Sequence, residues 1–283
     1  MIRGSEVLPQ VLAWAKERRQ SPGKVWGLST GFSSWDELTG GLHKGEVTVL
    51  GARTSVGKTT LALQVAWAAL SSGPVLFVSP EMGERQLLTR LLAMKSGVSP
   101  RLLARGELSD LEWERVERTA QELGPKTQNL ILYCSETDLV SLEQKVEELN
   151  LLSPLSLLVI DYLQLIRHQA FSPYERATEI SRRVRALANR TQVPVLLLSQ
   201  LRRPEGGRED QPPTLHDLRD SGNIEQDADN VLLLWRPPVE DGNGGLLRSN
   251  ITVVELAKQR NGPVGSFKLL FVPERFCFED LKA

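Results

Sequence analysis

A short loop between an apolar strand and an amphipathic helix holds residue types that bind phosphate. The stretch VTVLGARTSVGKTTLAL places Gly57, Lys58 and Thr59 where the strand passes into the helix. In this setting backbone N–H groups and the helix N-terminus hold the phosphates, Lys58 reaches the β and γ groups, and Thr59 ligates Mg²⁺. The predicted nucleotide-binding segment is Ala52, Arg53, Thr54, Ser55, Val56, Gly57, Lys58, Thr59 and Thr60.

This loop departs from the strict phosphate-loop pattern GxxxxGK[ST] at its first position. Ala52 stands there, although Gly51 lies next to it. The alternative is a chance GKT at an ordinary turn. A strand before the loop and a helix after it are the context that a phosphate loop requires, so the sequence favours nucleotide binding.

The apolar run LLVIDYLQL, residues 157–165, contains a second candidate, Asp161. A carboxylate at the carboxyl edge of a parallel sheet can hold Mg²⁺ through water. The alternative is that Asp161 only caps the next helix. Together with a phosphate loop, the metal-binding interpretation is favoured, and Thr59 and Asp161 are the predicted metal ligands.

Glu81 follows the apolar strand VLFVS and is the candidate for polarising the attacking water. We expect its strand to lie beside the strand that leads into the phosphate loop, so that Glu81 reaches the edge where the γ-phosphate lies. Alternatively, Glu81 caps the following helix and favours its dipole. Glu84 is close enough in the sequence to be confused with it.

Short apolar strands that alternate with helical stretches would position these residues. The predicted strands are residues 47–50, 75–78, 130–133, 157–160, 195–198 and 231–235. Such near-continuous apolar runs predict a mostly parallel sheet with helices on both faces, an α/β fold. Further on, ITVVELAK, SFKLLF and FCF alternate with turns and predict an antiparallel C-terminal extension.

Local signals predict where several helices begin and end. Ser109 and Glu112 are spaced as a capping box, and Gly124-Pro125 predicts the end of that helix. Apolar residues recur at helical spacing over residues 6–19, with Pro9 expected in the first turn. The stretch QSPGKVWG then predicts a tether. We therefore divide the chain into an amphipathic linker helix with its tether, residues 1–26, and one α/β domain, residues 27–283.

Composition limits the other possibilities. The 283 residues are 41% apolar and can bury a full core. The net charge is -1, which excludes a global basic field, so any nucleic-acid contact must be local. Cys134 and Cys277 are neither closely spaced nor accompanied by clustered histidines, which argues against zinc. No signal peptide or apolar run of about 18 residues is evident, so we expect a cytoplasmic protein without membrane contact.

Seven strings between residues 26 and 281 resemble, in order, the RecA-like C-terminal motor domain of DnaB-type replicative helicases, preceded by its linker helix. They are STGFSSWDELTGGL, ARTSVGKTT, VLFVSPEM, LLVIDYLQL, VPVLLLSQLRR, DLRDSGNIEQDAD and AKQRNGPVG. The resemblance implies a RecA-like P-loop NTPase that uses ATP and Mg²⁺. It also implies a ring, usually a hexamer, with nucleotide sites between subunits and single-stranded DNA in the channel.

The resemblance assigns further catalytic roles. Lys58 is a phosphate ligand and Glu81 the catalytic base, while Gln200 in LSQ resembles the γ-phosphate sensor. Lys258 and Arg260 in KQRNG resemble the pair that reaches into the adjacent subunit's site, with Arg260 as the arginine finger. The alternative is a solvated strand end followed by a turn.

The family's DNA-facing loop corresponds here to Arg219, Asp220 and Gly222. Gly222 would let a backbone N–H approach a DNA phosphate, and Arg219 would add positive charge. Alternatively, Arg219 pairs with Asp217 or Asp220 on a surface turn. Three arginines of the preceding loop are weaker candidates: Arg202, Arg203 and Arg208.

We therefore predict an ATP-dependent, ring-forming DNA helicase motor that translocates on single-stranded DNA in replication. The alternative is a RecA-like DNA-dependent ATPase or a nucleotide-gated assembly factor that does not unwind DNA. Partners implied by the resemblance are single-stranded DNA, further copies of this chain and a helicase loader.

Overall fold

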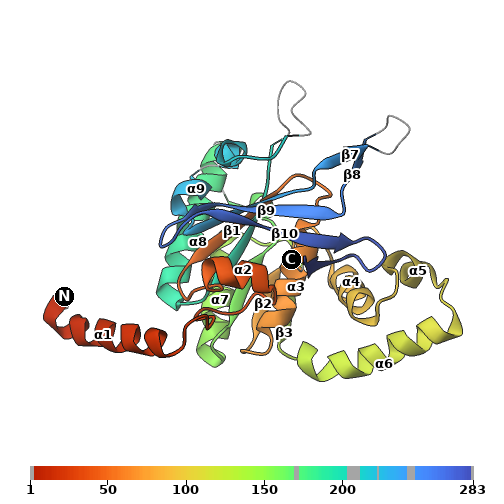
Figure 1. The fold of residues 1–283 in the computed structure, drawn as a ribbon, viewed down its shortest axis with the longest axis horizontal. Coiled ribbons are helices and arrows are strands. Elements are labelled where there is room, and N and C mark those ends of the chain that lie inside the picture. The colour runs from red at the N-terminus through yellow and green to blue at the C-terminus, as the bar shows by residue number, and fades with distance from the viewer. Residues whose placement is uncertain (1–2, 169–171, 203–210, 222, 241–245, 282–283) are drawn as a thin grey trace.

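A central sheet with helices on both faces organises the computed structural model (Figure 1). The structure describes residues 3–168, 172–202, 211–221, 223–240 and 246–281. Within them, strands of one sheet follow the order β11-β10-β9-β6-β1-β5-β4-β2-β3. The parallel strands are β1 (Val47–Ala52), β2 (Val75–Val78), β3 (Leu130–Tyr133), β4 (Leu157–Ile160), β5 (Val195–Gln200) and β6 (Asn230–Trp235). The antiparallel strands are β9 (Ile251–Gln259), β10 (Gly265–Val272) and β11 (Cys277–Asp280).

The predicted parallel sheet and its antiparallel extension are confirmed. Strand β1 shows why the apolar runs were informative, because all of its residues are buried. Alternate side chains enter opposite cores: Val47 and Val49 lie in one, Leu50 and Ala52 in the other. A strand covered on both faces needs apolar residues at every position, and the sequence records that need directly.

The helices form a layer on each face. They are α2 (Ser33–Thr39), α3 (Lys58–Ala69), α4 (Glu84–Ser96), α5 (Pro100–Arg105), α6 (Asp110–Thr127), α7 (Leu139–Leu152), α8 (Pro173–Thr191) and α9 (Ile224–Asp227). Leu61 of α3 and Leu87 of α4 are buried in one core, whereas Leu142 of α7 and Val184 of α8 are buried in the other. Truncating a fully buried leucine such as Leu142 to alanine costs about 2–5 kcal/mol, so both layers contribute to stability.

One expectation about strand order is wrong. Strand β2 does not lie beside β1, because β5 and β4 stand between them. The apolar pattern of a strand identifies it as central but carries no information about its neighbours. Those neighbours depend on where the crossover helices can pack, and here β4 and β5 lie between β1 and β2.

Two predicted helix signals are also wrong. Helix α6 begins with the Ser109–Glu112 capping box but continues through Pro125 to Thr127. Proline removes a single N–H donor, and so close to a helix end that loss does not stop the helix. Helix α1 (Gly4–Gln20) places Pro9 beyond its first turn. Because no residue of α1 is buried, water can satisfy the carbonyl that Pro9 leaves without a donor.

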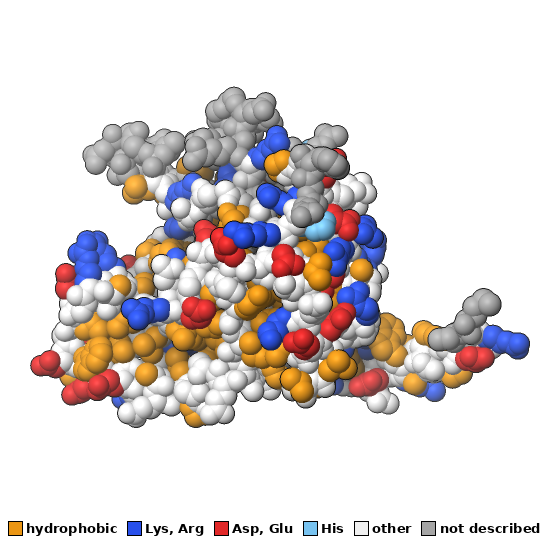
Figure 2. Space-filling model, turned by 180° about the vertical axis from the view of Figure 1, so that it is seen from behind, with side chains coloured by type: hydrophobic (Ala, Val, Ile, Leu, Met, Phe, Trp, Pro, Cys, Tyr) orange, Lys and Arg blue, Asp and Glu red, His pale blue; other side chains and the backbone are white. Residues whose placement is uncertain are grey.

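Helix α1 projects from the side of the sheet domain (Figure 1). Its large apolar side chains are exposed: Val7, Leu8, Val11, Leu12 and Trp14. The space-filling view shows hydrophobic side chains on the surface of the projecting helix (Figure 2). The helix therefore lies apart from the sheet domain, and its large apolar side chains are exposed in the part of the chain that the structure describes.

The described part of the fold also contains a short hairpin and two 3₁₀ segments. A hairpin of β7 (Pro238–Glu240) and β8 (Leu246–Arg248) was not predicted, because three-residue strands leave no alternating pattern. The 3₁₀ segments η1 (Leu163–Leu165) and η3 (Leu215–Ser221) follow β4 and β5. Among the described residues, none of the helices is both long and apolar enough to cross a membrane.

Candidate active site

The loop between β1 and α3 has the backbone of a phosphate cradle. Gly57, which caps the N-terminus of α3, has φ 109°, and Ser55 has φ 64°. A Cβ added at Gly57 would lie 2.7 Å from the ring of Phe278, so only glycine fits there. The turn leaves the first N–H groups of α3 facing the loop, where an anion is favoured.

A cleft of about 970 Å³ opens beside this loop. The phosphate-loop residues that line it are Arg53, Thr54, Ser55, Gly57, Lys58, Thr59 and Thr60. Ala52 and Val56 do not line it, because their side chains are buried in the hydrophobic core beneath the loop. From elsewhere in the chain come Glu81, Met82, Arg85, Gln86, Thr89, Arg90, Pro100, Ala104, Gln200 and Phe276. The predicted phosphate, base and sensor residues thus share one cleft.

Lys58 is a partly desolvated cation in this cleft. Burial lowers its pKa, while the nearby charges of Asp161 and Glu81 act in the opposite direction. Its Nζ lies 4.7 Å from the centre of the Tyr162 ring. A low-dielectric surrounding strengthens the attraction between this ammonium and an incoming phosphate.

Asp161 follows β4 and is fully buried. Neither of its carboxylate oxygens has a hydrogen-bond partner of good geometry. Burial raises the pKa of Asp161, and the neighbouring Thr59 hydroxyl and Lys58 ammonium partly offset that rise. A dry carboxylate with two unused oxygens beside a hydroxyl fits a hydrated Mg²⁺, which would supply the missing positive charge.

We expect Asp161→Asn to raise the thermal stability of the nucleotide-free protein at neutral pH. The raised pKa gives Asp161 a favourable contribution that is complete below its unfolded pKa of about 3.9 and is lost as pH rises through its folded pKa. At pH 7, which lies above the unfolded pKa, the raised pKa of Asp161 is therefore a cost to stability that asparagine removes. Thermal unfolding between pH 5 and pH 8 measures this, with about 2–4 °C expected per kcal/mol.

The matched control is Glu114→Gln, which neutralises an exposed carboxylate on α6. It should leave the melting temperature nearly unchanged at every pH. A melting temperature of Asp161→Asn that stays below that of the unaltered protein throughout would contradict the assignment of an uncompensated buried charge.

Glu81 is exposed in the cleft, and its charge acts on both Lys58 and Asp161. It reaches the cleft although β2 is not adjacent to β1. It does not cap α4, because the N-cap of that helix is Gly83. Glu84 does not line the cleft; it lies beside Cys134, where burial and Glu84 raise the pKa of the thiol to about 11. The geometry therefore favours Glu81 over Glu84 as the group near an attacking water.

Gln200 ends β5 and pairs in register with Ala52 at the end of β1. Its side chain lines the same cleft as the phosphate loop. The Gln164 side chain holds the backbone of Gln200 from η1, with its amide donating to the Gln200 carbonyl at 3.4 Å. The end of β5 from which the Gln200 side chain extends is therefore fixed, while the sensor role of that side chain stays a prediction.

Lys258 and Arg260 lie at the other end of the sheet's strands, at the amino ends of β1 and β6. Lys258 pairs with Val231 near the start of β6, whereas the phosphate loop follows the end of β1. The two edges are roughly 15 Å apart along the strands. Lys258 donates to the carbonyls of Glu225 at 2.5 Å and Ala228 at 2.8 Å, at the end of α9. The pair therefore does not line the cleft of its own chain.

Arg260 is half exposed at that edge. Its Nη1 lies 3.4 Å from Asp229, and its side chain is 51% exposed. Asp229 is already paired with Arg185 and also accepts from the backbone N–H of Val47. The hold on Arg260 is consequently weak, and its guanidinium can be released to a stronger anion.

The predicted DNA-facing residues lie on or next to η3. Arg219 and Asp220 belong to η3, but only their backbone is described, and Gly222 lies outside the described residues. Arg203 and Arg208 also lie outside them, whereas Arg202 is exposed.

Several residues in or beside the cleft were not predicted, among them Arg90, Tyr162 and Phe276. The Arg90 guanidinium lies 5.4 Å from the centre of the Phe276 ring. Burial lowers the pKa of Arg90, while Asp161 and Glu81 oppose that shift. No motif identifies Arg90 or Phe276, since each reaches the cleft only through tertiary packing. Tyr162 could have been found from its position directly after Asp161.

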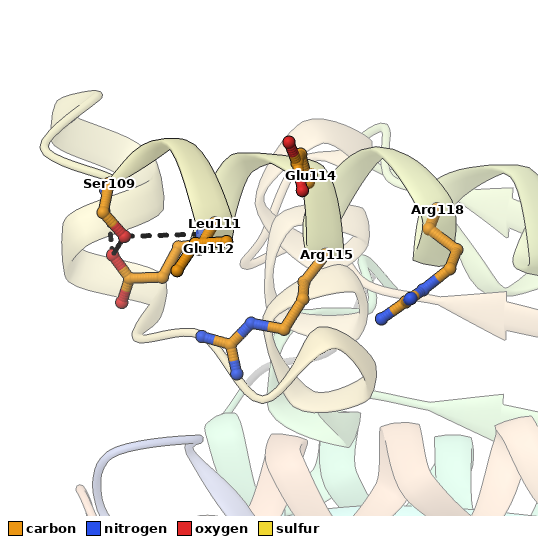
Figure 3. A pocket seen from close by; sticks show the side chains of 6 residues that line it. All are labelled: Ser109, Leu111, Glu112, Glu114, Arg115 and Arg118. Atoms are coloured by element: carbon orange, nitrogen blue, oxygen red, sulfur yellow. Dashed lines mark hydrogen bonds between the residues drawn. The ribbon is translucent and has the colours of Figure 1, made fainter.

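A second hollow follows one side of α6 (Figure 3). It is lined by Ser109, Leu111, Glu112, Glu114, Arg115 and Arg118. Arg115 and Arg118 extend along the same side of the helix (Figure 3). None of the described site residues that were predicted lines this hollow, whereas the phosphate-loop residues, Glu81 and Gln200 line the cleft.

Residues 27–280 match the family described as DnaB-like helicase C terminal domain. The chain belongs to this family. It is 35% identical to the replicative DNA helicase DnaC of Bacillus subtilis, over 98% of this chain and 62% of that protein. It is 36% identical to the replicative DNA helicase DnaB of Geobacillus stearothermophilus, over 92% of this chain and 58% of that protein. The chain thus spans about three fifths of the length of these relatives.

Solved structures agree with this membership. The ATPase domain of G40P superposes with a TM-score of 0.89 at 29% identity, covering 99% of this chain and 100% of that one. A DnaB-like replicative helicase described with its interactions with primase gives a TM-score of 0.86 at 29% identity, covering 100% of this DnaB-like chain and 68% of that one. The RadB recombinase, at 22% identity and a TM-score of 0.57, shares the fold alone, with 90% of this chain and 100% of that chain covered. The RecA-like fold predicted for the domain is confirmed.

Proposed function

We propose that this chain is the motor part of an ATP-dependent DNA helicase that forms a ring and translocates along single-stranded DNA in replication. One observation carries the proposal. The phosphate loop, Glu81 and Gln200 share a cleft at one edge of the sheet, whereas Lys258 and Arg260 lie at the opposite edge. A head-to-tail contact between copies would bring the second edge of one chain to the cleft of the next, and repeated contacts of this kind close into a ring.

The role in DNA replication is inferred from the relatives. Proteins named as replicative DNA helicases resemble this chain over nearly its whole length. A structural neighbour is described together with its interactions with primase. These names support DNA as the substrate class. A helicase loader as a further partner and the cytoplasm as the place of action are parts of the proposal that no relative's name states.

The residues of the cleft suit phosphoryl transfer from ATP to water. Lys58 and the loop N–H groups bind the β- and γ-phosphates, and Thr59 and Asp161 would hold Mg²⁺. Glu81 orients the attacking water and accepts its proton as the γ-phosphoryl group leaves ADP. Gln200 contacts the γ-phosphate, and Arg260 of the neighbouring copy stabilises the charge that develops on it.

The test is strand displacement on a forked duplex with Mg²⁺ and ATP. We expect the duplex to be unwound only when ATP is hydrolysed, and only when single-stranded DNA of one polarity is offered for loading. DNA-stimulated hydrolysis without displacement would instead indicate a DNA-dependent ATPase. Nucleotide-dependent assembly without DNA-stimulated hydrolysis would indicate an assembly factor.

We further propose that α1 docks on a neighbouring chain, most simply in a hexamer. At about 25 cal/mol per Å², burying its exposed apolar residues contributes several kcal/mol per contact before ordering costs are subtracted. We expect Leu8→Glu with Leu12→Glu to convert the ring to smaller species while nucleotide binding persists, measured by sedimentation. Gln10→Glu, which adds a charge on the same exposed helix, is the control. Unchanged sedimentation of the double variant would overturn the docking of α1.

DNA is proposed to bind through Arg219, Asp220 and Gly222. Since the overall net charge is -1, binding should depend on a few phosphate contacts. We expect Arg219→Ala to weaken oligo-dT binding and to reduce the slope of log affinity against log salt by about 1, while basal hydrolysis is retained. Titrations at several salt concentrations measure this. Equal slopes for both proteins would move the contact elsewhere, first to Arg202.

A further inference from the structure

The turn between β10 and β11 places an aromatic ring in the nucleotide cleft. Phe276 lines the same cleft as Lys58 and Thr59. Its φ is 52°, a left-handed conformation that is uncommon for a bulky residue. The backbone N–H of Phe276 donates to the carbonyl of Pro273 at 3.3 Å, which closes the turn. The turn therefore holds Phe276 in a conformation that it would rarely adopt elsewhere.

Packing ties this ring to the phosphate loop. Phe276 meets Phe271 edge to face, with ring centres 5.4 Å apart and an interplanar angle of 78°. Phe271 packs on Phe278 at 5.1 Å, and a Cβ at Gly57 would lie 2.7 Å from the Phe278 ring. Gln64 of α3 fixes the backbone of Phe278 with two hydrogen bonds of 2.9 and 2.7 Å. The position of Phe276 relative to the phosphate loop is thus set by a continuous aromatic contact.

The part of the cleft around Phe276 differs in chemistry from the phosphate end. Pro100 and Ala104 of α5 line it together with Phe276, and the Arg90 guanidinium lies 5.4 Å from the Phe276 ring centre. A nucleoside triphosphate has the same division, with a charged end and a flat aromatic end. Aromatic and guanidinium groups both stack on the faces of bases.

We infer that Phe276 is the stacking platform for the base of the bound nucleoside triphosphate. This inference rests on the proposed function, because it assumes that the phosphate loop binds the triphosphate. Stacking uses the π face that every base has, so the platform accepts purines and pyrimidines alike. Phe276 would then contribute to the affinity for any nucleotide while selecting weakly among bases.

The test compares a ligand that has a base with one that lacks it. ADP and inorganic pyrophosphate are titrated with Mg²⁺ against the full chain by calorimetry. We expect Phe276→Leu, which keeps an apolar side chain of similar reach, to weaken ADP binding about 10-fold. Its affinity for pyrophosphate should stay unchanged, and Phe276→Tyr should bind ADP as the unaltered chain does. Trp113→Ala, which removes an exposed ring on α6, is the matched control.

The outcomes separate the two proposals. Equal losses for ADP and pyrophosphate in Phe276→Leu would show that the ring only supports the phosphate loop, and unchanged ADP affinity would show that no base stacks there. Either result overturns the inference and leaves the proposed function standing. An unaltered chain that binds neither ligand overturns both.

Discussion

Lys58→Ala is expected to lower ATP hydrolysis by about 100- to 1000-fold, because it removes the ammonium group at the start of α3 that is proposed to bind the β- and γ-phosphates. The Lys58 ammonium is partly desolvated and faces Asp161 and Glu81. Without it, two carboxylates would repel the incoming triphosphate. Phosphate release with Mg²⁺ and ATP, with and without oligo-dT, measures the loss.

Lys145→Ala is the control for this variant, since Lys145 is an exposed lysine on α7 that pairs with Glu148 across one turn. It should hydrolyse ATP at the rate of the unaltered chain. Near-normal hydrolysis by Lys58→Ala, in a protein whose thermal unfolding is unchanged, would rule out the cleft as the site of catalysis.

Arg260→Ala is expected to lower hydrolysis by about 1000-fold in assembled rings while each chain still folds and binds nucleotide. Arg260 lies at the sheet edge opposite the phosphate loop and is 51% exposed. It therefore cannot serve its own cleft, but it is available to a neighbour's. Arg118→Ala, which removes an arginine on α6 that does not line the cleft, is the control and should retain full turnover.

Mixing Lys58→Ala chains with Arg260→Ala chains tests action between subunits directly. An active site then needs the phosphate loop of an Arg260→Ala chain and the arginine of a Lys58→Ala chain. With equal amounts and random head-to-tail assembly, each condition holds at half of the interfaces, so about a quarter of the sites are restored. No recovery in rings shown to contain both chains would contradict a shared site, and full turnover by Arg260→Ala alone would remove the finger role.

Local patterns in the sequence were sufficient for most of the elements. The predicted strands at residues 75–78, 130–133 and 157–160 coincide with β2, β3 and β4. The phosphate loop was recognisable because its chemistry depends on neighbours in the chain, a strand before Gly57 and a helix after it. The Ser109 capping box was recognisable for the same reason. The predicted stop signal was less reliable, because α6 continues past Pro125 to Thr127.

Tertiary structure decided which of these elements meet. The pattern of β2 did not reveal that β4 and β5 separate it from β1, yet Glu81 still reaches the cleft from its end. Nor did any local signal place Arg90 and Phe276 beside the phosphate loop, or Arg260 at the far edge of the sheet. A strand's side-chain pattern records how deeply the strand is buried. Two buried strands have the same pattern whether or not they are neighbours in the sheet, so the pattern does not give the strand order. Strand order and register depend instead on crossover paths and on contacts between residues far apart in the chain, which only the packed fold specifies.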